Sequence, residues 1–166
     1  MRSSMGLRCT LCREEHEGLP DIAMHAPDPY LEVPESERAD RTLFTPDRCT
    51  VRYEDGVHYF VRGVLYIPII GESDQFGIGV WVSQSRANFE RYTRRETMEP
   101  TFGWLANRIP HYRESTFLLK ARVCFSGVKE RPAIELEPTE HLLAVDQRTG
   151  ITLARAWEIV HNSLPN

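Results

Sequence analysis

The stretch CTVRYEDGVHYFVRGVLYIPII, residues 49–70, decides the fold of this chain. It contains two apolar runs separated by Asp55-Gly56, and an Asp-Gly pair between such runs is a strong signal for a β-hairpin. The second run, residues 58–70, is long, and Gly63 within it indicates a bulge or a close approach of another backbone segment. These residues predict an antiparallel pair whose second strand is central in a sheet.

The segments on either side of this hairpin predict a further strand and two helices. Residues 76–83 read as a strand whose glycines fall on one face, which leaves the apolar side chains on the other face. Ser85 is a suitable N-cap for an amphipathic helix that runs from Arg86 to about Arg95. Upstream, the prolines in 25–33 predict a loop, and a polar helix is expected over residues 35–42.

The C-terminal third predicts a second hairpin and a closing helix. Residues 117–125 and 131–137 are apolar runs joined by a loop that contains Gly127, and Thr152 is the expected N-cap of the last helix. Because the strands come in hairpins, we expect an α+β fold with one mostly antiparallel sheet of about five to six strands and two to three helices. We expect residues 1–166 to form a single domain, in which a zinc-knuckle-like segment, 1–18, packs on an α+β core of residues 48–164.

Composition excludes several classes of protein. Hydrophobic residues make up 41% and charged residues 27% of the 166 residues, which is typical of a packed globular chain. The formal charge of −4 gives no net basic field, so we expect no nucleic acid partner. The longest apolar run is far below the roughly 20 residues that cross a bilayer, so we expect no membrane span. Residues 1–8 contain no apolar run of signal-peptide length, which predicts a cytoplasmic location.

Three residues near the N-terminus have the spacing of metal ligands. Cys9, Cys12 and His16 form a C-x2-C-x3-H arrangement, in which the tight turn points both thiols at one spot. Zinc in a closed structural site takes four ligands. We expect Cys49, at the head of the first hairpin, to complete a Cys3His zinc site that ties the N-terminal segment to the sheet.

Other interpretations of this cluster remain open. His58 or His25 could replace Cys49, and a water molecule as fourth ligand would leave an open, catalytic metal. Alternatively, Cys9 and Cys12 are reduced surface thiols beside a solvated histidine. A redox dithiol suits the sequence less well, because such a C-x-x-C pair normally opens a helix after a strand.

Two carboxylates form the only catalytic candidate. Glu135 and Glu137 are two residues apart on a strand, so they project from the same face and could share a cation or divide acid and base roles. His141 lies nearby in the sequence and could line the same pocket. The simpler interpretation is a half-exposed strand, with Ile134 and Leu136 inward and the carboxylates outward.

Taken together, these segments resemble the bacterial family called domain of unknown function 2199. The stretches that carry the resemblance are CTLCREEHEGLPD (9–21), DRC (47–49), HYFVRGVLYIPIIG (58–71), GVWVSQSRANF (79–89), FGWL (102–105) and RPAIELEPTEHLLAVDQRTGIT (131–152). The resemblance implies a bacterial, cytosolic domain whose function is unassigned, and it implies the same four metal ligands. The chain departs from the family pattern at Arg13, where a glycine usually follows the second cysteine, and at Cys124, where a histidine is expected.

Three hypotheses about function follow. The first is a binding or adaptor module, with a protein partner and a structural zinc. The second is a metal-dependent or carboxylate-dependent enzyme with a pocket near Glu135, Glu137 and His141. The third is an immunity-type protein that binds a toxin. Because no motif of a catalytic family follows any predicted strand, the balance favours a protein that is not an enzyme.

Overall fold

The computed structural model describes residues 6–8, 15–17, 19–127 and 130–163, and side chains are described from residue 19 onward. Strands β1 (Gly6–Arg8) and β2 (Glu15–Glu17) form a separate antiparallel pair. Within the described residues, the expected N-terminal zinc knuckle is not shown, because only this strand pair is described in segment 1–18 and Cys9 and Cys12 lie outside the described residues. None of the helices in the described ranges is long and apolar enough to cross a bilayer.

Among the described residues, the main sheet has eight strands, joined in the order β3-β7-β6-β10-β9-β8, with β5 and β4 extending from β6. The strands are β3 (Ile22–Ala23), β4 (Thr42–Phe44), β5 (Arg48–Tyr53), β6 (Gly56–Pro68), β7 (Gln75–Gln84), β8 (Thr101–Trp104), β9 (Lys120–Cys124) and β10 (Ala133–Leu136). The hairpin predicted at Asp55-Gly56 is confirmed as β5 and β6, and Gly56 has the positive φ of 133° that such a turn requires.

The prediction of a mostly antiparallel sheet of five to six strands is wrong, because the sheet is mixed and larger. Strand β3 runs parallel to β7, and β10 runs parallel to β6. Hairpin signals report only strands that follow each other in the chain. The β10–β6 pairing joins strands separated by β7, β8 and β9, so no local signal in the sequence announces it.

The sheet curls so that β8 returns to the side of β7. The Trp104 amide donates a hydrogen bond to Ser83 Oγ at 2.9 Å, and Gln84 Nε2 donates to the carbonyl of Phe102 at 3.1 Å. The curl encloses the main core. This core is made of the inner faces of β6 and β7, which carry the apolar face predicted for residues 76–83, together with side chains of β9, β10 and the C-terminal helices.

The curl requires a glycine at position 63. A Cβ atom on Gly63 would lie 2.6 Å from Ile134 Cδ1 and 2.7 Å from the Pro132 carbonyl oxygen. The segment that leads into β10 therefore packs directly on the β6 backbone. This is the close approach that Gly63 indicates, and the ladder between β6 and β7 continues past it without interruption from Tyr59 to Pro68.

In the described part of the chain, five helices surround the sheet, more than the two to three predicted. They are α1 (Asp28–Glu32), α2 (Glu35–Arg41), α3 (Arg86–Thr93), α4 (Leu142–Thr149) and α5 (Leu153–Ser163). One of them, α1, lies in the segment predicted as loop. Its Pro29 stands in the first turn, where the missing N–H costs no helical hydrogen bond. The predicted N-caps are confirmed, since Ser85 accepts from Asn88 N at 3.1 Å and Thr152 from Arg155 N at 3.1 Å.

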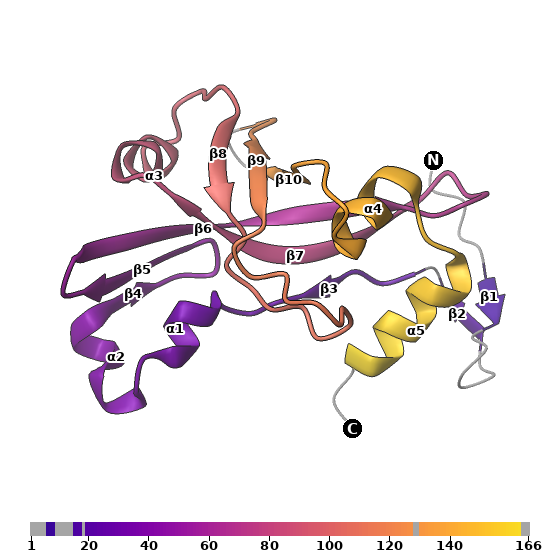
Figure 1. Ribbon diagram of the computed structural model, residues 1–166. Coiled ribbons are helices and arrows are strands. Elements are labelled where there is room, and N and C mark those ends of the chain that lie inside the picture. The colour runs from indigo at the N-terminus through magenta and orange to yellow at the C-terminus, as the bar shows by residue number, and fades with distance from the viewer. Residues whose placement is uncertain (1–5, 9–14, 18, 128–129, 164–166) are drawn as a thin grey trace.

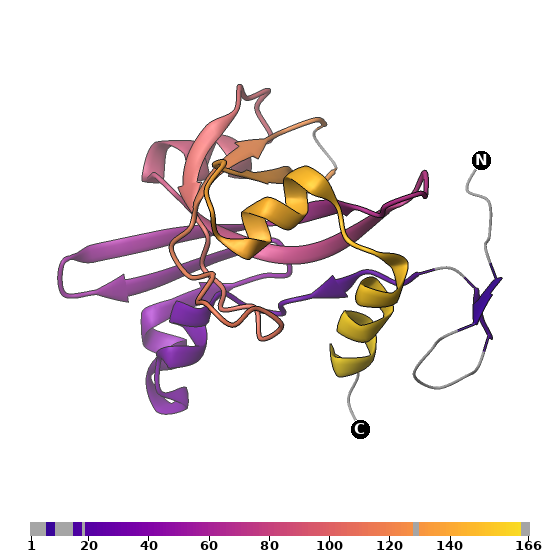
Figure 2. The same ribbon diagram turned by 45° about the vertical axis from the view of Figure 1, so that its right-hand side comes forward.

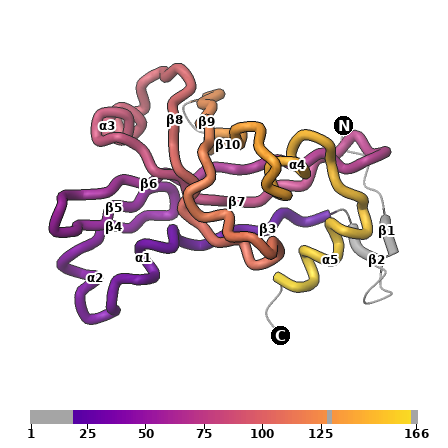
Figure 3. Tube along the Cα trace, in the orientation of Figure 1, coloured from indigo at the N-terminus to yellow at the C-terminus, as the bar shows by residue number. Residues whose placement is uncertain are grey.

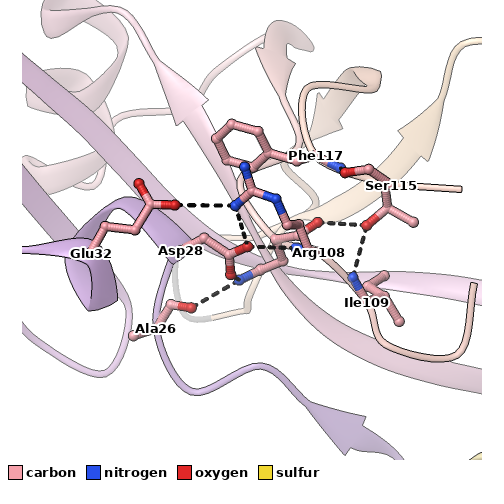
Figure 4. Close-up of polar contacts among 9 residues, drawn as sticks. Ala26, Asp28, Glu32, Arg108, Ile109, Ser115 and Phe117 are labelled. Carbon is pink, nitrogen blue, oxygen red and sulfur yellow. Dashed lines mark hydrogen bonds and ion pairs between the residues drawn. The ribbon is translucent and has the colours of Figure 1, made fainter.

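The helices lie at the two ends of the long β6–β7 pair. Figures 1 and 2 show α1 and α2 beside β4 and β5 at one end, and α4 and α5 at the other. The loop between β8 and β9 passes β7 and reaches the start of α1, as Figure 3 traces. Its Arg108 forms ion pairs with Asp28 and Glu32 at 3.2 Å each and lies over the Phe117 ring (Figure 4). This loop therefore joins two parts of the fold that are distant in sequence.

Candidate functional site

Strands β8, β9 and β10 present one face to solvent, on which exposed side chains form two rows across the strands. The residues of this ladder face are Phe102 and Trp104 on β8, Lys120 and Arg122 on β9, and Glu135 and Glu137 at the end of β10. The register places Phe102 opposite Arg122, and Arg122 opposite Glu135. In the second row, Trp104 lies opposite Lys120. Each row runs from an aromatic ring through a cation toward a carboxylate.

The two rings face outward because Gly103 between them packs against β7. A Cβ atom at Gly103 would lie 2.5 Å from the Ser83 carbonyl oxygen, so this position accepts no side chain. Strand alternation then turns both neighbours to solvent. Phe102 is 54% exposed and Trp104 is 39% exposed, and their rings meet edge to face with centroids 5.0 Å apart.

A cavity of about 670 Å³ lies on the ladder face. Its lining includes Phe102, Lys120, Arg122, Glu135 and Glu137. A second cavity, of about 400 Å³, lies on the β6 side of β10 and shares the lining residues Glu135 and Leu136 with the first. The two cavities therefore lie next to each other at β10.

The charges of the ladder face are available to a ligand. None of its four charged side chains forms an ion pair with another described residue. The Lys120 ammonium lies 5.7 Å from the centroid of the Trp104 ring, within the range of a cation–π contact. The half-buried Cys124 thiol shares the face. Its pKa is raised by burial and then by the Glu135 carboxylate, while Arg122 acts in the opposite direction.

Of the three predicted catalytic candidates, the structure brings two together. Glu135 and Glu137 both line the cavity of the ladder face, as their spacing predicts. His141 is not among its lining residues and caps α4 instead. Its Nδ1 accepts from Leu143 N at 3.0 Å, so Nε2 carries the proton and donates to the Glu114 and Ser115 carbonyls, each at 3.2 Å. Both ring nitrogens are thus engaged in holding the helix start.

Cys49 is the predicted metal ligand whose side chain the structure describes. It is buried on β5 in an apolar cluster with Val33, Val51, Phe60, Trp81 and Ala106. Burial raises the pKa of the Cys49 thiol to about 12. Zinc binds the thiolate, so an ion at this position would have to stabilise a negative charge in apolar surroundings.

The other predicted ligands are not gathered around Cys49 by the described side chains. Cys9 and Cys12 lie outside the described residues, and His16 is described only by its backbone, opposite Leu7. The alternatives His25 and His58 are both exposed, and His58 Nε2 lies 3.3 Å from Asp55. From residue 19 onward, no three histidine, cysteine or carboxylate side chains of the described part converge as a metal site. The Cys3His site stays a prediction.

The aromatic half of the ladder face was missed by sequence reasoning. The strand F-G-W at 102–104 is visible in the sequence, and alternation places its two rings on one face. Which face they occupy depends on Gly103, whose contact is with β7, a strand distant in the chain. A short strand with two large aromatic residues around a glycine is the signal that could have indicated an exposed pair.

Comparison with known proteins places the chain among bacterial proteins. Neither the curated proteins nor the solved structures contain a match to it. The sequence profile of one family covers residues 8–151, which include every strand of the main sheet, the ladder face and the four predicted metal ligands. The chain belongs to the family described as "Uncharacterized protein conserved in bacteria (DUF2199)".

Proposed function

We propose that the chain is a protein-binding module whose ladder face holds a segment of a partner polypeptide. The observation that carries the proposal is the exposure of Phe102 and Trp104 beside a cavity of about 670 Å³. Large aromatic side chains and arginine are enriched in the energetically dominant parts of protein interfaces. Rings held rigidly on a strand also lose little conformational entropy when a partner covers them.

The charges of the face favour a polypeptide over other ligands. Two cations and two carboxylates stand side by side, so the face has no excess positive charge to hold a nucleic acid backbone or an anionic membrane. A polypeptide can place charges of both signs within a short distance. A carboxylate would meet Arg122 and Lys120, and a basic side chain would meet Glu135 and Glu137.

The order of the charges specifies the partner further. Neighbouring strands are about 4.8 Å apart, so each row spans about 10 Å from the aromatic ring to the carboxylate. An extended chain covers that distance in about three residues. The partner segment should therefore carry an apolar, an acidic and a basic residue in this order, in one chain direction or the other, within a short stretch.

An array of synthetic peptides tests this order. The peptides hold one apolar, one acidic and one basic residue in all six orders within the same neutral flanking sequence, and binding is measured by fluorescence anisotropy. We expect the order apolar, acidic, basic, or its exact reverse, to bind most tightly. In the double variant Arg122→Glu with Glu135→Arg, the preference should change to apolar, basic, acidic, because the charges of one row are exchanged.

A matched pair of alanine variants locates the contact. Phe102→Ala should weaken binding of the preferred peptide by about tenfold or more, which corresponds to the loss of an aromatic anchor. Leu43→Ala should leave binding unchanged, although Leu43 on β4 is 73% exposed. Equal binding of all six orders, or an unchanged affinity in Phe102→Ala, would contradict the proposal.

We also propose that Cys9, Cys12, His16 and Cys49 bind a structural zinc ion. The support is the ligand chemistry, since two thiols and an imidazole at C-x2-C-x3-H spacing are ligands that zinc prefers. The ion would hold the N-terminal segment against β5 and take no part in binding the partner. The two proposals are therefore independent.

A further inference from the structure

A third cavity, of about 480 Å³, shares no lining residue with the cavity of the ladder face and has a different character. Three parts of the chain form it: the turn between β4 and β5, the end of α3 with the residues that follow it, and the segment before β10. We call it the arginine cavity, and the residues that matter here are Asp47, Arg48, Tyr92, Arg95 and Arg131.

Within the part of the chain that the structure describes, two of the three arginines that line this cavity have no acidic partner. Arg131 Nε lies 2.8 Å from Asp47 Oδ1, so this pair is neutral as a whole. Across the described residues, no carboxylate forms an ion pair with Arg48 or Arg95. The other acidic lining residue, Glu130, accepts a hydrogen bond from Ser126 Oγ at 3.1 Å. The cavity is thus locally cationic in a chain whose formal charge is −4.

A further arginine adds to this charge from behind the turn. Arg62 of β6 donates from Nη1 to the Pro46 carbonyl at 3.3 Å, and its buried Nε has no hydrogen-bond partner among the described residues. Burial, and then the nearby charge of Arg131, lower the pKa of Arg62, while Asp47 acts in the opposite direction. The turn therefore lies among several guanidinium groups and contains a single carboxylate.

The cavity also offers a neutral hydrogen-bond donor. Burial raises the pKa of the Tyr92 hydroxyl, and the Asp47 carboxylate raises this pKa further. The charges of Arg48 and Arg131 act in the opposite direction. The hydroxyl therefore keeps its proton at neutral pH. Arg95 beside it ends helix α3 in the left-handed conformation, with a φ of 58°, and the Glu96 amide donates to the Arg91 carbonyl at 3.1 Å, as in a common helix C-terminal motif.

We infer that the arginine cavity binds the phosphoryl group of a phosphomonoester. Guanidinium groups match the oxygens of a phosphate with paired hydrogen bonds, and the three lining arginines outnumber the two lining carboxylates, Asp47 and Glu130, which leaves a net positive charge for an anion. The volume exceeds that of inorganic phosphate and falls in the range of small-molecule sites, so it leaves room for the group that carries the phosphate. This site is separate from the ladder face and does not depend on its function.

Calorimetric titration with phenyl phosphate tests the inference, with phenyl sulfate as the monoanionic control of the same shape. We expect saturable binding of phenyl phosphate and at least about tenfold weaker binding of phenyl sulfate, because the second charge is missing. A phosphoserine decapeptide distinguishes the source of the phosphate. If the peptide binds more tightly than phenyl phosphate, the natural ligand is a phosphorylated protein. If phenyl phosphate binds more tightly, the natural ligand is a small phosphorylated metabolite.

Three glutamine variants locate the site. Arg48→Gln and Arg95→Gln should each weaken phenyl phosphate binding about tenfold, as expected for the loss of a charge-assisted hydrogen bond. Arg52→Gln is the matched control on the same strand, exposed and outside the cavity, and should bind as wild type. In the wild type, the amide signals of Asp47, Thr93 and Arg131 should shift on titration. Absence of saturable binding, unchanged affinity in both test variants, or shifts confined to other residues would overturn the inference.

Discussion

Asn107 in the β8–β9 loop accepts a hydrogen bond on Oδ1 from the Trp81 amide of β7, at 2.8 Å, while both residues are buried. The same carboxamide donates from Nδ2 to the Ala26 carbonyl at 2.9 Å and to Asp28 Oδ1 at 3.2 Å. One side chain thus satisfies backbone groups of β7 and of the segment that leads into α1. The loop is held at its base by this residue, and Thr116 closes it by donating to the Asn107 carbonyl at 2.6 Å.

Replacing Asn107 by alanine should destabilise the protein strongly. The Trp81 amide and the Ala26 carbonyl would lose their partner inside the fold, and such unsatisfied groups cost about 1–3 kcal/mol each. We expect a loss of about 3 kcal/mol in the free energy of unfolding. Urea denaturation measures this loss, and the slope of the free energy against urea concentration should stay the same. The neighbouring Arg108→Ala removes exposed ion pairs with Asp28 and Glu32 and should cost less than about 1 kcal/mol. Equal losses in the two variants would show that Asn107 does not have this role.

The buried pair Tyr112 and Asp146 predicts a pH dependence of stability. Tyr112 donates to Asp146 Oδ2 at 2.8 Å, and burial, followed by Asp146, raises the pKa of the Tyr112 phenol. Above the pKa of about 10 of an unfolded tyrosine, only the unfolded state releases this proton. The contribution of Tyr112 to the free energy of unfolding is therefore constant below that pH and falls above it, by about 1.4 kcal/mol per pH unit.

Urea denaturation from pH 8 to pH 11 measures this effect as the difference in the free energy of unfolding between the wild type and Tyr112→Phe. The variant should be less stable at pH 8, because Asp146 loses its partner, and the difference should shrink as the pH rises above about 10. Tyr66→Phe is the control, since Tyr66 is exposed, and its difference from wild type should not change over this range. A constant difference for Tyr112→Phe would be inconsistent with a raised pKa.

Gly63 should not tolerate alanine. The added methyl group would meet Ile134 and the Pro132 carbonyl at less than 3 Å, and the backbone contact cannot move away as a flexible side chain could. Overpacking of this kind costs about 1–3 kcal/mol, which we expect as a lower midpoint in urea. Gly127→Ala provides the comparison, because a Cβ there would have its nearest neighbour at 3.8 Å, and it should change stability little. The prediction fails if both alanine variants unfold at the same midpoint.

The purified protein should contain about one zinc ion per chain if the Cys3His site forms. Elemental analysis should show loss of the metal in Cys9→Ser, Cys12→Ser and Cys49→Ala, and chelation should lower the melting temperature of the wild type. Cys124→Ser should keep its zinc. Loss in Cys9→Ser combined with full zinc in Cys49→Ala would show that the fourth ligand is another group, and a protein without metal and with four titratable thiols would exclude the site.

Local features of this fold could be predicted because neighbouring residues produce them. The Asp55-Gly56 turn, the capping by Ser85 and Thr152, and the apolar face of residues 76–82 depend on contacts within a few positions along the chain. The helix α1 could not be predicted in this way. Its prolines are compatible both with a loop and with a first helical turn. The start of the helix is held by a hydrogen bond from Asp28 N to the Ala106 carbonyl, at 2.8 Å, and this contact is tertiary, so it cannot be read from neighbouring residues.

By itself, the sequence determined the strands of both hairpins and of residues 76–83, a bulge or close approach at Gly63, and which cysteines have the spacing of zinc ligands. The tertiary structure decided that β10 pairs with β6 in parallel, and that Phe102, Arg122 and Glu135 form one row. It also brought Arg48, Arg95 and Arg131 to one cavity from three separate segments. The physical reason is that strand alternation fixes a side chain relative to its own strand, whereas its neighbours across the sheet depend on the path of the whole chain.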